Sequence, residues 1–543
     1  MILIAVLALF VPARSTPSVD GSVYYDAATR KFTFQEGLDP TAAAYATFTD
    51  EIFTTGWSRL TVTTNGLYDD RIQAFAAGFV ESHLTYELIH NHNINTVGSY
   101  CSQPSSYCSR LESYLNQQTR WINDQIQKNN SDYWYQISLI LHQLEGIQYG
   151  YGNVTQGKDG YDISPRHFLL MNLDGDLEDL EVALGAPASS QRRIMGSGSC
   201  SSLIKVLPEM SDVLVSHDMW GTYHSMLRIF KLYNFSLHQH RHGELIPGHK
   251  IAFSSYPATL VSLDDFYMLS SRLVTLETTI GNSNEERWKY VKPEGTLSYW
   301  MRVIVANRMS TAGRGWCEMF EKYNSGTYNN EWMIFDYKRF QPGSHRIEHD
   351  TFWVLEQIPG YVEYHDMSEV LNVKGYWGSY NNPAFPKVAN MSGIPELIKK
   401  YGDYFDHDKA PRARIYARNQ SQVTDLESMY KLQRYNNFQH DPLSRCNCTP
   451  PYSAENSIAA RSDLNPASGI YEFPALGHRP HGATDCKITS SEMIKTLSCL
   501  AESGPTHQQQ PVFQWSTSTF SNLSHLGMPD RYDFTPITIH WDL

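Results

Sequence analysis

An abrupt change from a Gly/Ser-rich segment to a β-strand at Cys200 constrains this chain more than any other feature of its sequence. Residues 159–199 are rich in Gly, Ser, Asp and Pro and end in Gly196-Ser-Gly-Ser199, which predicts a mobile surface segment. Residues 200–207 read Cys-Ser-Ser-Leu-Ile-Lys-Val-Leu, which predicts a buried strand. The fold must therefore place a thiol at the first position of a strand, directly after a flexible connection.

This order of segments suits a nucleophile that becomes a new N-terminus. The Cys200 thiol would attack the carbonyl of Ser199, take over its acyl group, and release a new chain end when the thioester is hydrolysed. Cys200 would then supply both the attacking sulfur and a base, its own α-amine, whose ordinary pKa lies near 8. The alternative interpretation is an inert cysteine buried on a core strand.

A tight turn pairs this strand with the next one. Pro208-Glu-Met-Ser211 predicts the turn, and residues 212–218 predict the second strand. If Leu207 pairs with Asp212, then Cys200 lies opposite Met219. This register predicts three candidate site residues near the thiol: His217, Asp218 and Trp220. His217 or Asp218 could orient the α-amine or lower the thiol pKa, and Asp218 is also a candidate for substrate binding.

The rest of the chain mixes helical and extended patterns without an internal repeat. Apolar residues at three- and four-residue spacing predict helices near 72–92, 110–128 and 133–147, and another over 297–309. Shorter β-like runs predict strands at 58–64, 249–263 and 272–280.

The N-terminus and the sequons predict an exported glycoprotein, secreted or lysosomal. Residues 1–13 contain a ten-residue apolar run that is too short to span a bilayer, with small residues at −3 and −1 of a cleavage site, so we expect a signal peptide. No later stretch predicts a transmembrane segment. Glycosylation is expected at six Asn-x-Ser/Thr sequons, Asn129, Asn153, Asn234, Asn390, Asn419 and Asn522. A seventh sequon, at Asn447, lies between two cysteines and is disfavoured.

Eight cysteines in an exported chain predict disulfides. Cys101 and Cys108 could close a small loop. Cys200 and Cys317 remain outside the expected bridges. The other candidates form a C-terminal group of open connectivity: Cys446, Cys448, Cys486 and Cys499.

Charge excludes nucleic acid as a partner. The chain has 44 basic and 57 acidic side chains, a formal net charge of −13, and no basic cluster that could follow a phosphate backbone. Its 21 histidines would bring the balance to +8 if all were protonated. This composition suits an acidic compartment.

Motifs for metals and cofactors are weak, and we expect neither. His238, His240 and His242 could hold zinc, but an exposed polar segment is favoured. Residues 172–178 alternate acidic groups without the remaining features of a calcium loop, and a solvated acidic loop is favoured. Cys446-x-Cys448 with His478 and His481 could also bind zinc, but a disulfide is favoured.

Several long blocks resemble the phospholipase B-like (lamina ancestor) family over nearly the whole mature chain. They include Leu173-Asp-Gly-Asp-Leu-Glu-Asp-Leu180, Gly198-Ser-Cys-Ser-Ser-Leu-Ile-Lys205, His217-Asp-Met-Trp-Gly-Thr-Tyr223, Tyr435-Asn-Asn-Phe-Gln-His-Asp-Pro442 and His481-Gly-Ala-Thr-Asp485.

The resemblance implies an α+β fold, the four-layer αββα sandwich of N-terminal nucleophile hydrolases. It also implies self-cleavage between Ser199 and Cys200, with fragments 14–199 and 200–543 that stay associated. The pocket residues that it implies are Cys200, His217, Trp220, Asn381, Asn382 and Arg414, with Asn382 as oxyanion donor and Arg412 as an alternative to Arg414.

The implied substrate is a phospholipid that loses its fatty acyl chains. Because N-terminal cysteine hydrolases mostly cut amides, an N-acyl amide hydrolase with the same machinery is the first alternative. A glycoprotein without catalysis, which binds lipid or a partner, is the second. The sequence leaves oligomeric state and chain-length preference open.

Overall fold

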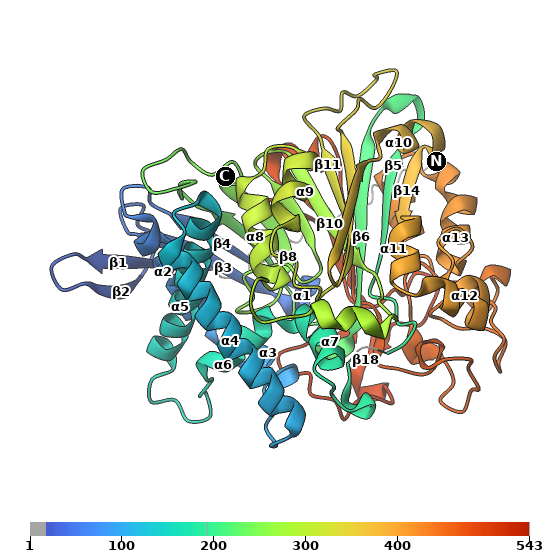
Figure 1. The fold of residues 1–543 in the computed structure, drawn as a ribbon, viewed down its shortest axis with the longest axis horizontal. Coiled ribbons are helices and arrows are strands. Elements are labelled where there is room, and N and C mark those ends of the chain that lie inside the picture. The colour runs from blue at the N-terminus through green and yellow to red at the C-terminus, as the bar shows by residue number, and fades with distance from the viewer. Residues whose placement is uncertain (1–17, 193, 542–543) are drawn as a thin grey trace, which may run out of the picture.

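Two β-sheets packed face to face form the centre of the computed structural model, which describes residues 18–192 and 194–541 (Figure 1). Neighbouring described strands are antiparallel except β4 and β7, which run parallel. In spatial order the larger sheet contains β13 (Tyr361–Asp366), β12 (Phe352–Ile358), β11 (Asn330–Asp336), β10 (Leu273–Thr279), β9 (Phe266–Leu269), β8 (Lys250–Ser255), β7 (Ile229–Asn234), β4 (Trp57–Thr64), β3 (Ala44–Glu51), β1 (Ser18–Asp26) and β2 (Lys31–Glu36).

The smaller sheet carries Cys200 on one of its inner strands. Its order is β14 (Tyr376–Ser379), β5 (Cys200–Val206), β6 (Val213–Thr222), β16 (Asp485–Thr489), β17 (Cys499–Ser503) and β20 (Ile537–Ile539), with β15 (His481–Ala483) also paired to β6.

Helices cover both outer faces. The larger sheet is covered by α2 (Asp70–Leu84), α3 (Tyr86–Asn95), α4 (Ser106–Lys128), α5 (Asp132–Thr155), α8 (Tyr299–Met309) and α9 (Gly313–Glu321). The smaller sheet is covered by α13 (Pro411–Asn419) and α14 (Leu426–Gln433). A third apolar layer lies between the sheets and includes Ile204, Val215, Phe230, Leu276 and Met333. The predicted four-layer αββα architecture is therefore confirmed.

The predicted hairpin is confirmed residue by residue. Leu207 N–H donates to Asp212 O at 2.9 Å, and Cys200 lies opposite Met219. The predicted helices correspond to α2 with α3, α4, α5 and α8, and the predicted strands to β4, β8 and β10.

The prediction of one open segment over 159–199 is wrong for its middle part. Helices α6 (Pro165–Asn172) and α7 (Asp174–Ala183) occupy it, and Leu177 and Leu180 are buried. Gly175 serves close packing, because a Cβ there would lie 2.7 Å from the ring of Tyr328. The described residues of 159–164 and 184–199 are irregular, apart from a 3-10 turn at Ala188–Ser190.

The predicted acidic loop is also a structural element. Asp176 is buried and accepts a hydrogen bond from Tyr299 N–H at 3.1 Å, and Asp179 accepts one from Asn329 Nδ2 at 2.9 Å. These carboxyl groups attach α7 to the neighbouring segments and are not solvated.

The expected Cys101–Cys108 disulfide forms, and within the C-terminal group of open connectivity Cys446 pairs with Cys448. The expectation of a disulfide for Cys486 and Cys499 is wrong. Cys486 lies opposite Glu502 in the β16–β17 register, and the two thiols belong to apolar clusters on opposite faces of the sheet. Cys200 and Cys317 are likewise free and buried.

The predicted signal peptide lies outside the described residues. Within them, no helix has the length and apolar character needed to cross a bilayer. Four of the expected glycosylation asparagines are exposed: Asn129, Asn153, Asn390 and Asn522. Asn234 and Asn419 are half-buried.

Candidate active site

Cys200 begins β5 and points into the space between the two sheets. Its strand partner Met219 faces it, with Sδ 3.8 Å from the Cys200 sulfur. Residues on a strand alternate between faces, and Ile204 on the same face as Cys200 belongs to the apolar layer between the sheets. Cys200 itself is fully buried.

His217 shares this inner face, whereas Asp218 and Trp220 do not. His217 pairs with Ser202, two residues after Cys200. Asp218 pairs with Ser201 on the outer face and is fully buried there. Asp218 lines neither of the two cavities described below, so the structure does not support its predicted role in substrate binding.

The carbonyl of Ser199 is held by the backbone of Trp220, whose N–H donates a hydrogen bond to it at 2.5 Å. A nucleophilic attack by Cys200 would turn this carbonyl oxygen into an oxyanion, so the Trp220 N–H already occupies the position of an oxyanion donor. Gly198 allows this close approach, because a Cβ there would lie 2.7 Å from the Trp220 ring.

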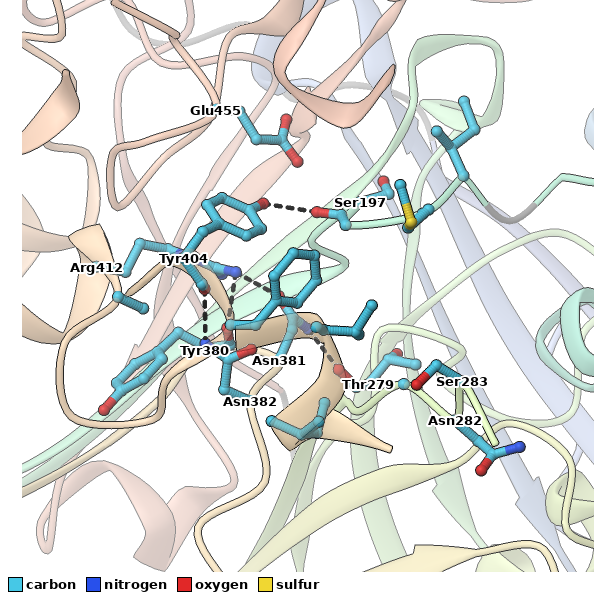
Figure 2. A pocket seen from close by; sticks show the side chains of 18 of the residues that line it. Ser197, Thr279, Asn282, Ser283, Tyr380, Asn381, Asn382, Tyr404, Arg412 and Glu455 are labelled. Carbon is cyan, nitrogen blue, oxygen red and sulfur yellow. Dashed lines mark hydrogen bonds between the residues drawn. The ribbon is translucent and has the colours of Figure 1, made fainter. Parts of the chain in front are cut away.

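Asn381 and Arg412 lie beside one another (Figure 2) and bind the backbone on the two sides of the Ser199–Cys200 bond. Asn381 Oδ1 accepts hydrogen bonds from Ser199 N–H at 3.1 Å and from Arg412 Nη2 at 2.7 Å. Arg412 Nη1 donates to Cys200 O at 2.6 Å, and its guanidinium stacks on Trp220, 4.2 Å from the ring centre. Asn381 adopts φ = 74°, a region that asparagine tolerates better than most residues.

The structure places Arg412, and not Arg414, at the site. Helix α13 buries Arg412, Ala413, Ile415 and Tyr416, while Arg414 is exposed on its other face. Asn382 lines a cavity near the site, but its Nδ2 donates to Tyr404 O at 3.1 Å and Asp406 O at 3.4 Å. It therefore positions the loop at 404–406, and the N–H group on the Ser199 carbonyl oxygen is that of Trp220.

Burial keeps Cys200 and His217 neutral in the intact chain. It raises the pKa of the Cys200 thiol well above its ordinary value, and nearby Glu277 raises it further. It lowers the pKa of His217 well below 6.5, assisted by the charge of Lys487. His217 Nε2 lies 2.9 Å from Glu277 O, which can only accept, so Nε2 carries the proton and Nδ1 is a free acceptor.

Residues upstream of Cys200 run through a buried polar site that sequence analysis did not identify. Gly198 N–H donates to Glu455 Oε1 at 3.1 Å, and Arg479 Nη1 donates to Ser197 Oγ at 3.0 Å. Tyr404 O–H donates to Gly196 O at 2.6 Å. Glu455 and Arg479 have no local sequence signal of function. His481, which also lies near Ser197, falls within one of the sequence blocks that resemble the family.

Two cavities flank residues 194–199. The smaller, about 250 Å³, is lined by Asn381, Asn382, Arg412 and Glu455, with apolar residues such as Leu397 and Phe405 (Figure 2). The larger, about 880 Å³, is lined by Ser199, Met219, Trp220, Arg479 and His481. Because Ile194 and Ser197 line both, this short segment lies between the two spaces.

Several of the residues considered for metals have other partners. Cys446 and Cys448 bond to each other. His238 Nδ1 lies 2.9 Å from Asp70 Oδ1, and His240 Nδ1 lies 3.5 Å from Asp132 Oδ1. Across the described part of the chain, no group of three or more histidine, cysteine or acidic side chains is arranged to hold a metal ion.

Comparison with known proteins shows the family of this chain. The sequence model of the family Phospholipase B matches residues 44–539, which contain every site residue described above. The chain belongs to the phospholipase B-like family. It is 48% identical to the human "Putative phospholipase B-like 2" over 530 residues, which cover 96% of this chain and 90% of the human protein.

More distant phospholipase B-like proteins also match along almost the whole chain. The Caenorhabditis elegans "Putative phospholipase B-like 1" is 40% identical over 96% of this chain and 91% of its own length. The Dictyostelium discoideum "Phospholipase B-like protein B" is 40% identical over 93% of this chain and 86% of its own length. The resemblance drawn from the sequence blocks is confirmed.

Proposed function

We propose that this phospholipase B-like chain is a hydrolase that cleaves itself between Ser199 and Cys200 and then removes fatty acyl chains from phospholipids. The observation that carries the proposal is the hydrogen bond from Trp220 N–H to Ser199 O, because it places an oxyanion donor on the carbonyl preceding a strand-initial thiol.

In the proposed self-cleavage, the Cys200 sulfur attacks the carbonyl carbon of Ser199. The thiol proton passes to a neutral base, for which His217 Nδ1 is the free acceptor on the same face. The C–N bond then breaks and the nitrogen of Cys200 leaves as an amine, having gained a proton. Water hydrolyses the thioester, which releases the carboxylate of Ser199 and restores the thiol.

In the mature protein the same sulfur would attack a substrate carbonyl. The new α-amine of Cys200 would accept the thiol proton and later protonate the leaving alcohol or amine. Arg412 binds Cys200 O and would hold the new chain end in place. Trp220 N–H would bind the substrate oxyanion as it binds Ser199 O.

The fold supports continued association of fragments 14–199 and 200–543. Strand β4 of the first pairs with β7 of the second from Ser58 to Thr63, within one sheet. The apolar cluster on the outer face of this sheet also combines residues from both fragments. Cleavage at Ser199 would therefore leave an extensive shared core intact.

Buried carboxyl groups support the proposal of a secreted or lysosomal protein that works at acidic pH. Burial raises the pKa of several fully buried acids, so in the folded chain they keep a proton at pH values where an exposed acid is already ionised. They include Asp176, Asp218, Asp265, Glu277, Glu331 and Glu356.

An N-acyl amide is the second candidate substrate. The segment now in the site is a peptide, and its N–H groups are bound by Asn381 and Glu455. A site that cuts its own amide bond already has the donors and acceptors that amide cleavage needs. A protein that only cleaves itself and then binds lipid is the third.

Hydrolysis by purified, matured protein tests the proposal. We expect release of fatty acid from phosphatidylcholine at pH about 5, and none from the Cys200→Ala variant. Turnover of an N-acylethanolamine instead would select the amidase. Turnover of neither substrate by cleaved protein would select the binding protein and contradict the proposed activity.

A further inference from the structure

Ser197 occupies a polar site whose other members belong to the second fragment. Its hydroxyl oxygen accepts a hydrogen bond from Arg479 Nη1 at 3.0 Å and lies 3.5 Å from His481 Nε2. Two donors from residues far apart in sequence from Ser197 thus converge on one oxygen atom, two residues before the Ser199 carbonyl.

Both donors are buried and incompletely bonded. Arg479 is 9% exposed and His481 is 7% exposed, and both line the larger cavity. Arg479 Nε has no hydrogen-bond partner within the described residues, while Nη1 binds Ser197 and Nη2 binds Glu455 and Ala475 O. In the neutral His481 ring, Nε2–H is the donor toward Ser197 and Nδ1 is an acceptor. Without Ser197, Arg479 Nη1 and Nε and His481 Nε2 would be buried donors that lack acceptors, which suits a ligand with several acceptor oxygens.

Two guanidinium groups and one carboxylate lie nearest to Ser197: Arg412, Arg479 and Glu455. The wall of the larger cavity also carries Asp174, Glu178, Glu181 and Arg192, so the excess of positive charge is confined to the end of the cavity at Ser197. Glu455 Oε2 binds Arg479 Nη2 at 2.9 Å and lies 3.9 Å from His481 Nδ1. Burial lowers the pKa of His481 well below its ordinary value, and the charges of Arg479 and Arg412 lower it further, so the ring is neutral.

We propose that Arg479 and His481 form a phosphate-binding site that Ser197 fills before cleavage and vacates when residues 194–199 move away. The proposal rests on the proposed function and names the group that the site recognises. A planar guanidinium with a neighbouring N–H donor matches the oxygens of a phosphate. In a phospholipid the phosphate lies close to the acyl ester, as this site lies close to the Ser199 carbonyl.

Calorimetric titration tests this site with two probes, inorganic phosphate and glycerophosphocholine. We expect matured wild-type protein to bind, and Arg479→Gln to weaken binding about tenfold or more, the contribution of one charge-assisted hydrogen bond. His481→Gln should weaken it several-fold. Arg418→Gln, which alters a distant ion pair with Asp441, is the matched control and should bind as wild type.

Uncleaved variants separate this proposal from the proposed function. Cys200→Ala should not bind either probe, because Ser197 stays in place, whereas Cys200→Ala with Ser197→Gly should bind. If wild type is not cleaved but the double variant binds, self-cleavage fails and the phosphate site stands. If wild type is cleaved and binds neither probe, the phosphate site is overturned and self-cleavage stands.

The outcome with the two probes identifies the source of the phosphate. Binding of both supports recognition of a lipid headgroup, and binding of inorganic phosphate alone supports a free anion. Should Arg479→Gln fail to fold, Arg479→Lys keeps the charge and loses the planar pair of donors, and it should still weaken binding. Unchanged affinity in a folded Arg479 variant would overturn the site.

Discussion

Trp220 donates its backbone N–H to the carbonyl oxygen of Ser199 at 2.5 Å, so one hydrogen bond of the β5–β6 ladder also polarises the bond before Cys200. An extended strand needs this bond for its own pairing, and an attack by Cys200 needs it for charge stabilisation. The proposed oxyanion donor is therefore a backbone group and not a dedicated side chain.

Arg412 should matter for self-cleavage and Arg414 should not. Arg412→Lys keeps the charge but loses the paired contacts to Cys200 O and Asn381, and we expect cleavage to slow about tenfold or more. Arg414→Lys on the same helix is the matched control, because Arg414 is exposed. A time course of fragment formation measures both, and equal rates would refute the assignment.

Gly198→Ala should also slow fragment formation. The added Cβ would lie 2.7 Å from the Trp220 ring and 3.0 Å from Arg412 Nη2, so either the segment or both partners must shift. Gly152→Ala in α5 is the control, since a Cβ there would meet no atom of another segment within 4 Å. Wild-type rates in Gly198→Ala would show that the observed approach to Trp220 is not needed.

Stability should fall as pH rises, with Asp176 as one source. Burial raises the pKa of Asp176 to about 7, so the native state keeps a proton that the unfolded chain releases above 3.8. The unfolded state then binds fewer protons, and up to roughly 4 kcal/mol of unfolding free energy is lost between these two values. Asp176→Asn should flatten this dependence in urea denaturation at several pH values. An equal slope of unfolding free energy against pH in the variant and the wild type would contradict this prediction.

Sequence patterns predicted the sheets and the hairpin better than the faces of the site residues. The turn at 208–211 fixed the register, and Cys200 does lie opposite Met219. Residues that this register places near Cys200 do not all share its face of the sheet, because side-chain direction alternates along β6. Asp218 therefore points away from Cys200, although it is next to Met219.

Contacts between distant segments explain the other differences. The sequence alone could not decide whether Arg412 or Arg414 belongs to the site. The choice depends on where the helix begins, and because it begins at Pro411, Arg412 lies on its buried face. Glu455 and Arg479 reach Gly198 and Ser197 across more than 250 residues, and no local pattern could pair them.

The number of free thiols tests the corrected cysteine assignment. Alkylation of the denatured protein without reduction should modify Cys200, Cys317, Cys486 and Cys499, and peptide mapping should find the bridges Cys101–Cys108 and Cys446–Cys448. A bridge between Cys486 and Cys499 would require β16 and β17 to change their register. A mapped peptide containing that bridge would disprove the assignment.

Mass spectrometry of the purified protein tests most directly whether Cys200 becomes a chain end. We expect two polypeptides, of which the larger begins with Cys200, and a single polypeptide when Cys200 is replaced by alanine. Intact wild-type protein, or a second fragment that begins at another residue and also forms in Cys200→Ala, would contradict it.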